Sequence, residues 1–198
     1  MRICPRLLDL IRDSLEVGAS VTETTDLITA VSDAVVEKFI SLAMVETGPA
    51  PTDFAFVCLG SEGRREQTLK TDQDNAILFN DLGKGESLVS FQSYFLKLGE
   101  RVCSWLDKAG YNFCKGGIMA NNPRWCQPLS VWKDYFSSWI HTPCPEDLLH
   151  ACVFFDLRFV YGKDSLADKL STHLFKALSG WPGFFRDMAE NAVFFPSH

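Results

Sequence analysis

The sequence predicts an α/β (α+β) fold, in which a small mixed β-sheet is flanked by helices on its N-terminal and C-terminal sides. Two segments before residue 50 carry apolar side chains at helical spacing. Two short apolar runs follow, separated by a polar stretch, and the rest of the chain returns to helical spacing. With 198 residues, the chain is long enough for one large domain or for a core with a helical annex.

Residues 1–50 form the predicted N-terminal helical segment. Residues 4–17 predict a first helix, and residues 22–46 predict a longer second one. The Gly-Pro-Ala-Pro sequence at 48–51 ends the second helix. One stripe of that helix is apolar and comprises Ile28, Val31, Val35, Phe39 and Leu42.

The predicted core covers residues 51–125 and contains two buried strands. Phe54–Leu59 and Ala76–Phe79 are short apolar runs rich in rings or branched side chains, as buried strands are. The first run ends in Gly60-Ser61, and the second is closed by a turn at Asn80–Gly83.

After this pair of strands, residues 86–109 predict a helix that ends at Gly110. Tyr111–Met119 is expected to hold a third, irregular strand, and Asn121–Pro123 a turn. Residues 126–198 form the predicted C-terminal helical segment, with helices at 129–140, 145–161, 165–179 and 183–193. A stripe of rings at helical spacing is expected to pack in the core and comprises Trp132, Tyr135, Phe136 and Trp139.

Composition narrows the class of protein. The net charge of −6 argues against a general nucleic-acid binder, which usually has a basic face. No run of 18 apolar residues is present, so no membrane span is expected, and charges inside the first helix argue against a signal peptide. Seven scattered cysteines without a CxxC pair favour reduced thiols and a cytoplasmic location. His141, Cys144, His150 and Cys152 match no regular zinc spacing, so ordinary structural roles are favoured over a zinc site.

The segment with chemical information is Gly60 to Asn75, GSEGRREQTLKTDQDN. Asp72 and Asp74 are two residues apart, and such residues share one side of a strand. Two carboxylates that converge repel each other unless a cation neutralises them, and Mg²⁺ is commonly held by one or two carboxylates with substrate phosphates. Two such ions can support a displacement at phosphorus. The alternative is an ordinary solvated Asp-x-Asp loop.

Gly60-Ser61 supplies groups that suit a triphosphate. A glycine lets the backbone approach a phosphate closely, and backbone N–H groups with the Ser61 hydroxyl can bind its oxygens. Gly63 keeps the turn compact, and Arg64 and Arg65 carry guanidinium groups that match phosphate oxygens.

The string GSEGRREQTLKTDQDNAILF resembles the N-terminal nucleotidyltransferase domain of the protein-PII uridylyltransferase-like family, within the polymerase β-type nucleotidyltransferase superfamily. Similarity continues through GGIMANNPRW, LSVWKDYFSSWI and FFDLRFVYG, and so covers most of the chain beyond about Thr22. Domains of this family often accompany CBS or cyclic-nucleotide-binding modules in bacterial signalling proteins. They usually continue with more helix, so the resemblance implies a truncated C-terminal segment.

The resemblance implies transfer of a nucleotidyl group, uridylyl in the nearest relatives, from a nucleoside triphosphate to an acceptor such as a small regulatory protein, with release of pyrophosphate. It implies that Asp72 and Asp74 bind two Mg²⁺ ions, for which Mn²⁺ is an alternative. The expected nucleotide-binding positions are Gly60, Ser61, Gly63, Arg64, Arg65 and Gln67. The alternative function is a non-catalytic, nucleotide-sensing regulatory module.

Enzymes of this kind commonly use a third carboxylate from a later strand, and Asp156 is the candidate. If 152–160 is a strand, Asp156 and Arg158 share a face and could reach the metals. If it is a helix, which we favour, Asp156 lies on a stripe with Val153 and Val160 and is expected to pair with an arginine. Asp147 is a weaker candidate, because an acidic residue is expected at a helix start.

Overall fold

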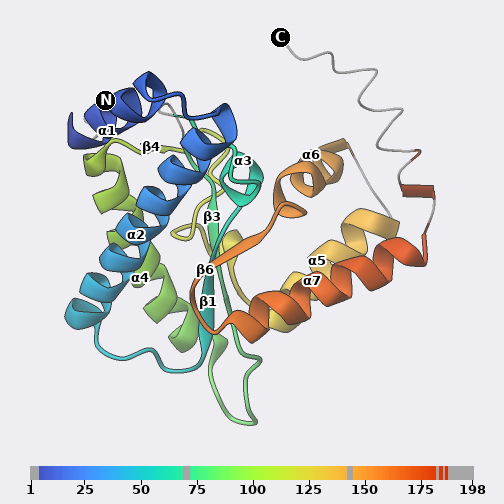
Figure 1. Ribbon diagram of the computed structural model, residues 1–198. Coiled ribbons are helices and arrows are strands. Elements are labelled where there is room, and N and C mark those ends of the chain that lie inside the picture. Colours follow the sequence, from blue (N-terminus) through green and yellow to red (C-terminus); the bar gives the residue numbers. More distant parts are fainter. Residues whose placement is uncertain (1–4, 69–71, 142–144, 182, 185, 187–198) are drawn as a thin grey trace.

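The computed structural model describes residues 5–68, 72–141, 145–181, 183–184 and 186. A four-stranded mixed sheet stands at the centre with helices on both faces, which confirms the predicted class (Figure 1). Within the described residues, no helix has the length and apolar character needed to cross a lipid bilayer.

The sheet has the strand order β5-β3-β1-β6. The central strand β1 (Phe54–Cys58) pairs antiparallel with β3 (Asn75–Phe79) on one side and with β6 (Arg158–Gly162) on the other. The edge strand β5 (Cys126–Pro128) runs parallel to β3. Because β1 has a partner along both edges, its backbone N–H and C=O groups are paired inside the protein.

Two short elements lie at the end of the sheet where β1 stops. The single helical turn α3 (Gly60–Gly63) follows β1 almost directly. β2 (Asp72–Gln73) precedes β3 and pairs in parallel with β4 (Asn112–Phe113), forming a second, two-stranded sheet. The candidate site motif therefore lies at this end of the fold.

One face of the sheet is covered by α2 (Val21–Thr47) and α4 (Leu88–Ala109), with α1 (Pro5–Glu16) packed on α2 (Figure 1). A capping box starts α2, since Ser20 and Glu23 exchange hydrogen bonds between side chain and backbone. The buried side chains that contact each other on this face include Val36, Ile40, Phe54, Phe56, Ile77, Phe79, Phe95 and Val102.

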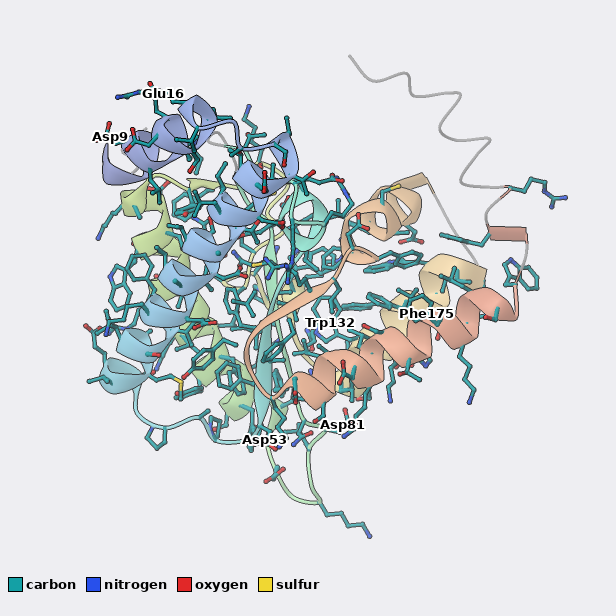
Figure 2. The ribbon with its side chains drawn as sticks, in the orientation of Figure 1. Asp9, Glu16, Asp53, Asp81, Trp132 and Phe175 are labelled. Carbon is teal, nitrogen blue, oxygen red and sulfur yellow. The ribbon has the colours of Figure 1, made fainter. Side chains whose placement is uncertain are left out.

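The opposite face is covered by α5 (Leu129–His141) and α7 (Asp164–Ser179). α6 (Pro145–Phe154) packs beside α5, and the 3₁₀ turn η1 (Pro123–Trp125) leads into β5. Trp132 lies between the sheet and these helices, and it is almost fully buried (Figure 2). The predicted ring stripe is therefore confirmed as core packing, with Trp132, Phe136 and Trp139 buried and Tyr135 partly buried against them.

Side chains of β1 point alternately to the two faces of the sheet, so this strand contributes to two hydrophobic clusters. Phe54, Phe56 and Cys58 belong to the cluster under α2 and α4, whereas Ala55 and Val57 belong to the cluster under α5 and α7. Every residue of β1 and β3 is buried, as expected for strands covered on both faces.

The predicted helix at 145–161 is wrong beyond Phe154, because β6 begins at Arg158. The second edge of β1 needs a hydrogen-bonding partner, and the ring-rich and β-branched sequence at 158–162 supplies it. The expected irregular strand at 111–119 shrinks to Asn112–Phe113. The C-terminal segment contributes the strands β5 and β6 as well as helices. Most of the helix expected at 183–193 lies outside the described residues.

Candidate active site

The turn that leaves β1 lies against the acidic motif. Gly60 has a positive φ of 55°, a conformation that favours glycine, and the backbone N–H of Leu59 donates to the carbonyl of Asp74 at 2.9 Å. A Cβ on Gly60 would lie 3.5 Å from Oδ2 of Asp74. The glycine-serine turn and Asp74, which are separated by a polar stretch in the sequence, are therefore direct neighbours in the fold.

Asp72 and Asp74 lie on either side of a buried residue. Gln73 is 2% exposed and points into the protein, where its amide donates to the carbonyls of Cys103 and Tyr111 at 3.0 and 2.9 Å. Asp72 is exposed and Asp74 is half-buried. Because neighbouring extended residues alternate in direction, the inward position of Gln73 directs both carboxylates to the other side of this segment.

The pKa of Asp74 reflects its burial and its neighbours. Burial raises the pKa of Asp74, a hydrogen bond from the Cys114 thiol lowers it, and the charge of Asp72 raises it, so that the net shift is upward. Burial raises the pKa of the Cys114 thiol, and its hydrogen bond with Asp74 raises it further. A bound divalent cation would offset the repulsion between the carboxylates and favour the ionised form of Asp74.

The chemistry of this donor set fits Mg²⁺ better than zinc. The described residues contain no group of three or more His, Cys, Asp or Glu side chains arranged to hold a metal. Mg²⁺ needs only one or two carboxylates when substrate phosphates and water complete its shell, whereas structural zinc takes four protein ligands. Of the residues weighed for zinc, Cys144 lies outside the described residues.

Ser61 and the arginines occupy the outer side of the turn. Ser61 is partly exposed in the first turn of α3, where backbone N–H groups lack intrahelical partners. Arg64 is held by Glu66 at 2.7 Å and by Asp156 at 2.5 Å. Arg65 is exposed and adopts a positive φ of 60°, which is uncommon for a residue other than glycine.

Gly63 and Gln67 lie on the inner side of the turn. A Cβ on Gly63 would lie 1.6 Å from the carbonyl oxygen of Asp156, so only glycine fits there. Gln67 is fully buried, and its amide makes no ordinary hydrogen bond among the described residues, although it lies close to the Glu62 carboxyl. Gln67 therefore has no exposed side-chain atoms for a phosphate to contact, and Gly63 is partly exposed and packs closely on the Asp156 backbone.

Asp156 lies in the turn between α6 and β6, and so belongs to neither the helix nor the strand that the sequence suggested. It has the arginine partner expected of it, Arg64, but it is about one-third exposed rather than buried. Its role as a third carboxylate remains a prediction.

Several residues near the motif were not among the sequence-based candidates. Cys114 contacts Asp74, and no residue pattern distinguishes it from the other cysteines. Glu62 is 5% exposed despite its place in a polar stretch. Asp33, on α2, forms an ion pair with Arg158. The proximity of these residues arises from the tertiary fold, because each pair is joined across a long stretch of sequence or across the turn.

The chain matches a known protein family. Residues 5–146 match the sequence model of the family described as "Putative nucleotidyltransferase DUF294". The match covers well over half of the chain and includes the whole segment from Gly60 to Asn75. No curated protein shows significant similarity to the chain.

Proposed function

The chain belongs to the DUF294 family of nucleotidyltransferases, and on that premise we propose that it is a Mg²⁺-dependent enzyme that transfers a nucleotidyl group from a nucleoside triphosphate to an acceptor hydroxyl. The observation that carries the proposal is the position of Asp74, which is adjacent both to Gly60 of the turn and to the carboxylate of Asp72. A triphosphate bound at the turn would therefore lie beside the two carboxylates.

Asp72 and Asp74 would hold the metal ions, and Ser61 with the backbone N–H groups of the turn would bind the triphosphate. Two bound Mg²⁺ ions supply charge neutralisation of the phosphates and activation of the acceptor oxygen. In the transfer, the acceptor oxygen bonds to the α-phosphorus, the bond from the α-phosphorus to the bridging oxygen breaks, and pyrophosphate leaves. The acceptor proton passes to a nearby base, for which Asp156 is our candidate.

The resemblance of the motif to protein-PII uridylyltransferases supports a proposal for the donor and the acceptor. We propose UTP as the donor and a side-chain hydroxyl of a small regulatory protein as the acceptor. The net charge of −6 gives no support to a nucleic-acid acceptor. Regulatory domains fused to this one in a longer protein would fit the same role.

Thermal unfolding with each of the four ribonucleoside triphosphates, with and without Mg²⁺, tests the donor. A ligand at about 100 times its Kd stabilises the folded state by about 2.7 kcal/mol, which gives a measurable shift in Tm. We expect the largest shift with UTP and Mg²⁺, and no shift in an Asp72→Asn/Asp74→Asn variant. Absence of a shift with all four nucleotides in the wild-type chain would refute the proposed site.

A nucleotide-sensing module is a second candidate, because Asp156 is bound to Arg64 and the described residues contain no third ligand beside Asp72 and Asp74. Release of pyrophosphate distinguishes the two functions. An enzyme releases it in the presence of its acceptor, or slowly with water in its place. A sensor binds the nucleotide tightly and returns it intact after prolonged incubation.

A further inference from the structure

The segment Asp156-Leu157-Arg158 supports the nucleotide-binding turn from behind, although it lies beyond the residues that match the family. It connects α6 to β6, and Arg158 pairs in register with Cys58, two residues before Gly60. The segment therefore runs alongside β1 at the point where the turn begins.

The first contact is between backbones. The Asp156 carbonyl oxygen occupies the space that a Cβ on Gly63 would need, at a separation of 1.6 Å from that position. At the start of the turn, a Cβ on Gly60 would lie 3.6 Å from Cγ1 of Val153, on α6. The connection and the end of α6 thus limit movement of the turn on one side.

The second contact is made by the guanidinium of Arg158, which is mostly buried. Its Nε and Nη2 atoms donate to the carbonyl oxygen of Glu62 at 3.3 and 3.2 Å. Its Nη1 and Nη2 atoms also donate to the two carboxylate oxygens of Asp33 at 2.7 and 2.9 Å. One side chain of β6 thereby fixes the backbone of α3 and connects it to α2.

The turn needs such support because it has little stability of its own. A single turn of four residues does not form an independently stable helix. Leu59, the residue before it, provides no side-chain hydrogen bond as a cap, and Arg65 after it has a positive φ. Two hydrogen bonds hold the turn from within, from the N–H groups of Gly63 and Arg64 to the carbonyls of Leu59 and Gly60, and contacts from outside add to them.

We propose that Arg158, held by Asp33, is a positioning residue that keeps the turn at Gly60–Gly63 in its nucleotide-binding conformation. The effect on nucleotide affinity rests on the proposed function, whereas the effect on the turn does not. If the turn occupied the competent conformation only a tenth of the time, the apparent Kd for the nucleotide would rise about tenfold.

Arg158→Lys tests the proposal, because lysine keeps the charge but lacks the planar fork that contacts Asp33 and Glu62 together. The first measurement is amide hydrogen exchange without nucleotide at Gly63 and Arg64, whose N–H groups donate to the carbonyls of Leu59 and Gly60. The second measurement is the Kd for UTP with Mg²⁺. We expect exchange at these amides to become about tenfold faster and the Kd to rise about tenfold. Asp33→Asn, which leaves Arg158 in place, is expected to give the same two changes in smaller degree.

Arg101→Lys is the control for the substitution itself, because Arg101 forms an exposed ion pair with Glu46 between α4 and α2, away from the turn. It is expected to leave both measurements at the wild-type value. If both site variants match the wild type within twofold in exchange, the positioning role is refuted. A wild-type chain that binds no nucleotide refutes the proposed function instead, and the exchange measurement then still decides whether Arg158 holds the turn.

Discussion

Replacing Glu62 with glutamine removes a carboxyl group that the fold buries almost completely. Glu62 is 5% exposed, and burial raises its pKa from an ordinary 4.5 to about 7, against opposing contributions from the Cys58 thiol and Arg158. The charged form of Glu62 is therefore less favourable in the folded protein than in the unfolded chain.

The magnitude follows from this difference in pKa. Each unit of pKa corresponds to about 1.4 kcal/mol, so ionising Glu62 costs the folded state about 3 kcal/mol relative to the unfolded chain. Because the pKa is raised in the folded state, the folded protein binds more protons between pH 4.5 and 7. The contribution of Glu62 to stability is therefore largest below pH 4.5 and is lost as pH rises to 7.

Urea unfolding of the wild type and of Glu62→Gln at pH 5 and pH 8 measures this pH-dependent contribution of Glu62 to the free energy of unfolding. Between pH 5 and pH 8 the wild type is expected to lose about 2 to 3 kcal/mol of stability through Glu62, and Glu62→Gln is expected not to lose it. The free energy of unfolding of the variant minus that of the wild type should therefore be about 2 to 3 kcal/mol larger at pH 8 than at pH 5. Glu100→Gln, a change at an exposed carboxyl of α4, is the control and is expected to show no such increase. A difference between Glu62→Gln and wild type that is equal at both pH values would refute the reasoning.

Two further substitutions test the packing of the two sides of the fold. Gly63→Ala places a Cβ against the Asp156 carbonyl oxygen and is expected to destabilise the protein by about 1–3 kcal/mol and to weaken UTP binding, whereas Gly180→Ala, whose nearest neighbour would be 3.5 Å away, is expected to do neither. Trp132→Ala empties a site that is 1% exposed and removes a hydrogen bond to the Ile77 carbonyl, so a loss of about 3–5 kcal/mol is expected in urea unfolding. Unchanged UTP binding and stability in the first variant, or a loss under 1 kcal/mol in the second, would contradict the packing described.

The local spacing of apolar residues is sufficient to predict the elements that carry the motif. The strand at 54–58 is apolar throughout because both of its faces are buried, and such a run is readable without knowledge of its partners. Helical spacing also predicts the long helices α2 and α4. The buried face of α2 nevertheless includes Val36, Ile40 and Ala43, and Leu42 of the predicted apolar stripe is exposed. Gly60, Asp72 and Asp74 could be proposed as one site because a strand, a turn and a second strand follow each other closely in the sequence.

Local pattern failed where the conformation depends on distant partners. The sequence at 158–162 has apolar residues compatible with either period, and it becomes a strand because the free edge of β1 is nearby. The ion pair of Arg158 with Asp33 joins residues 125 positions apart, so no local spacing reveals it. Glu62 and Gln67 look solvent-exposed within a polar stretch, but the turn directs both into the interior.

The central claim is that Asp74 belongs to a metal-dependent triphosphate site, and calorimetric titration of UTP with Mg²⁺ into Asp74→Asn tests it most directly. Asp53→Asn is the matched control, since Asp53 is an exposed aspartate at the opposite end of the sheet from α3 (Figure 2). We predict Mg²⁺-dependent binding of UTP to the wild type and to Asp53→Asn, and at least a roughly tenfold weaker affinity for Asp74→Asn. Equal affinity of all three proteins, or binding that does not depend on Mg²⁺, would contradict the account.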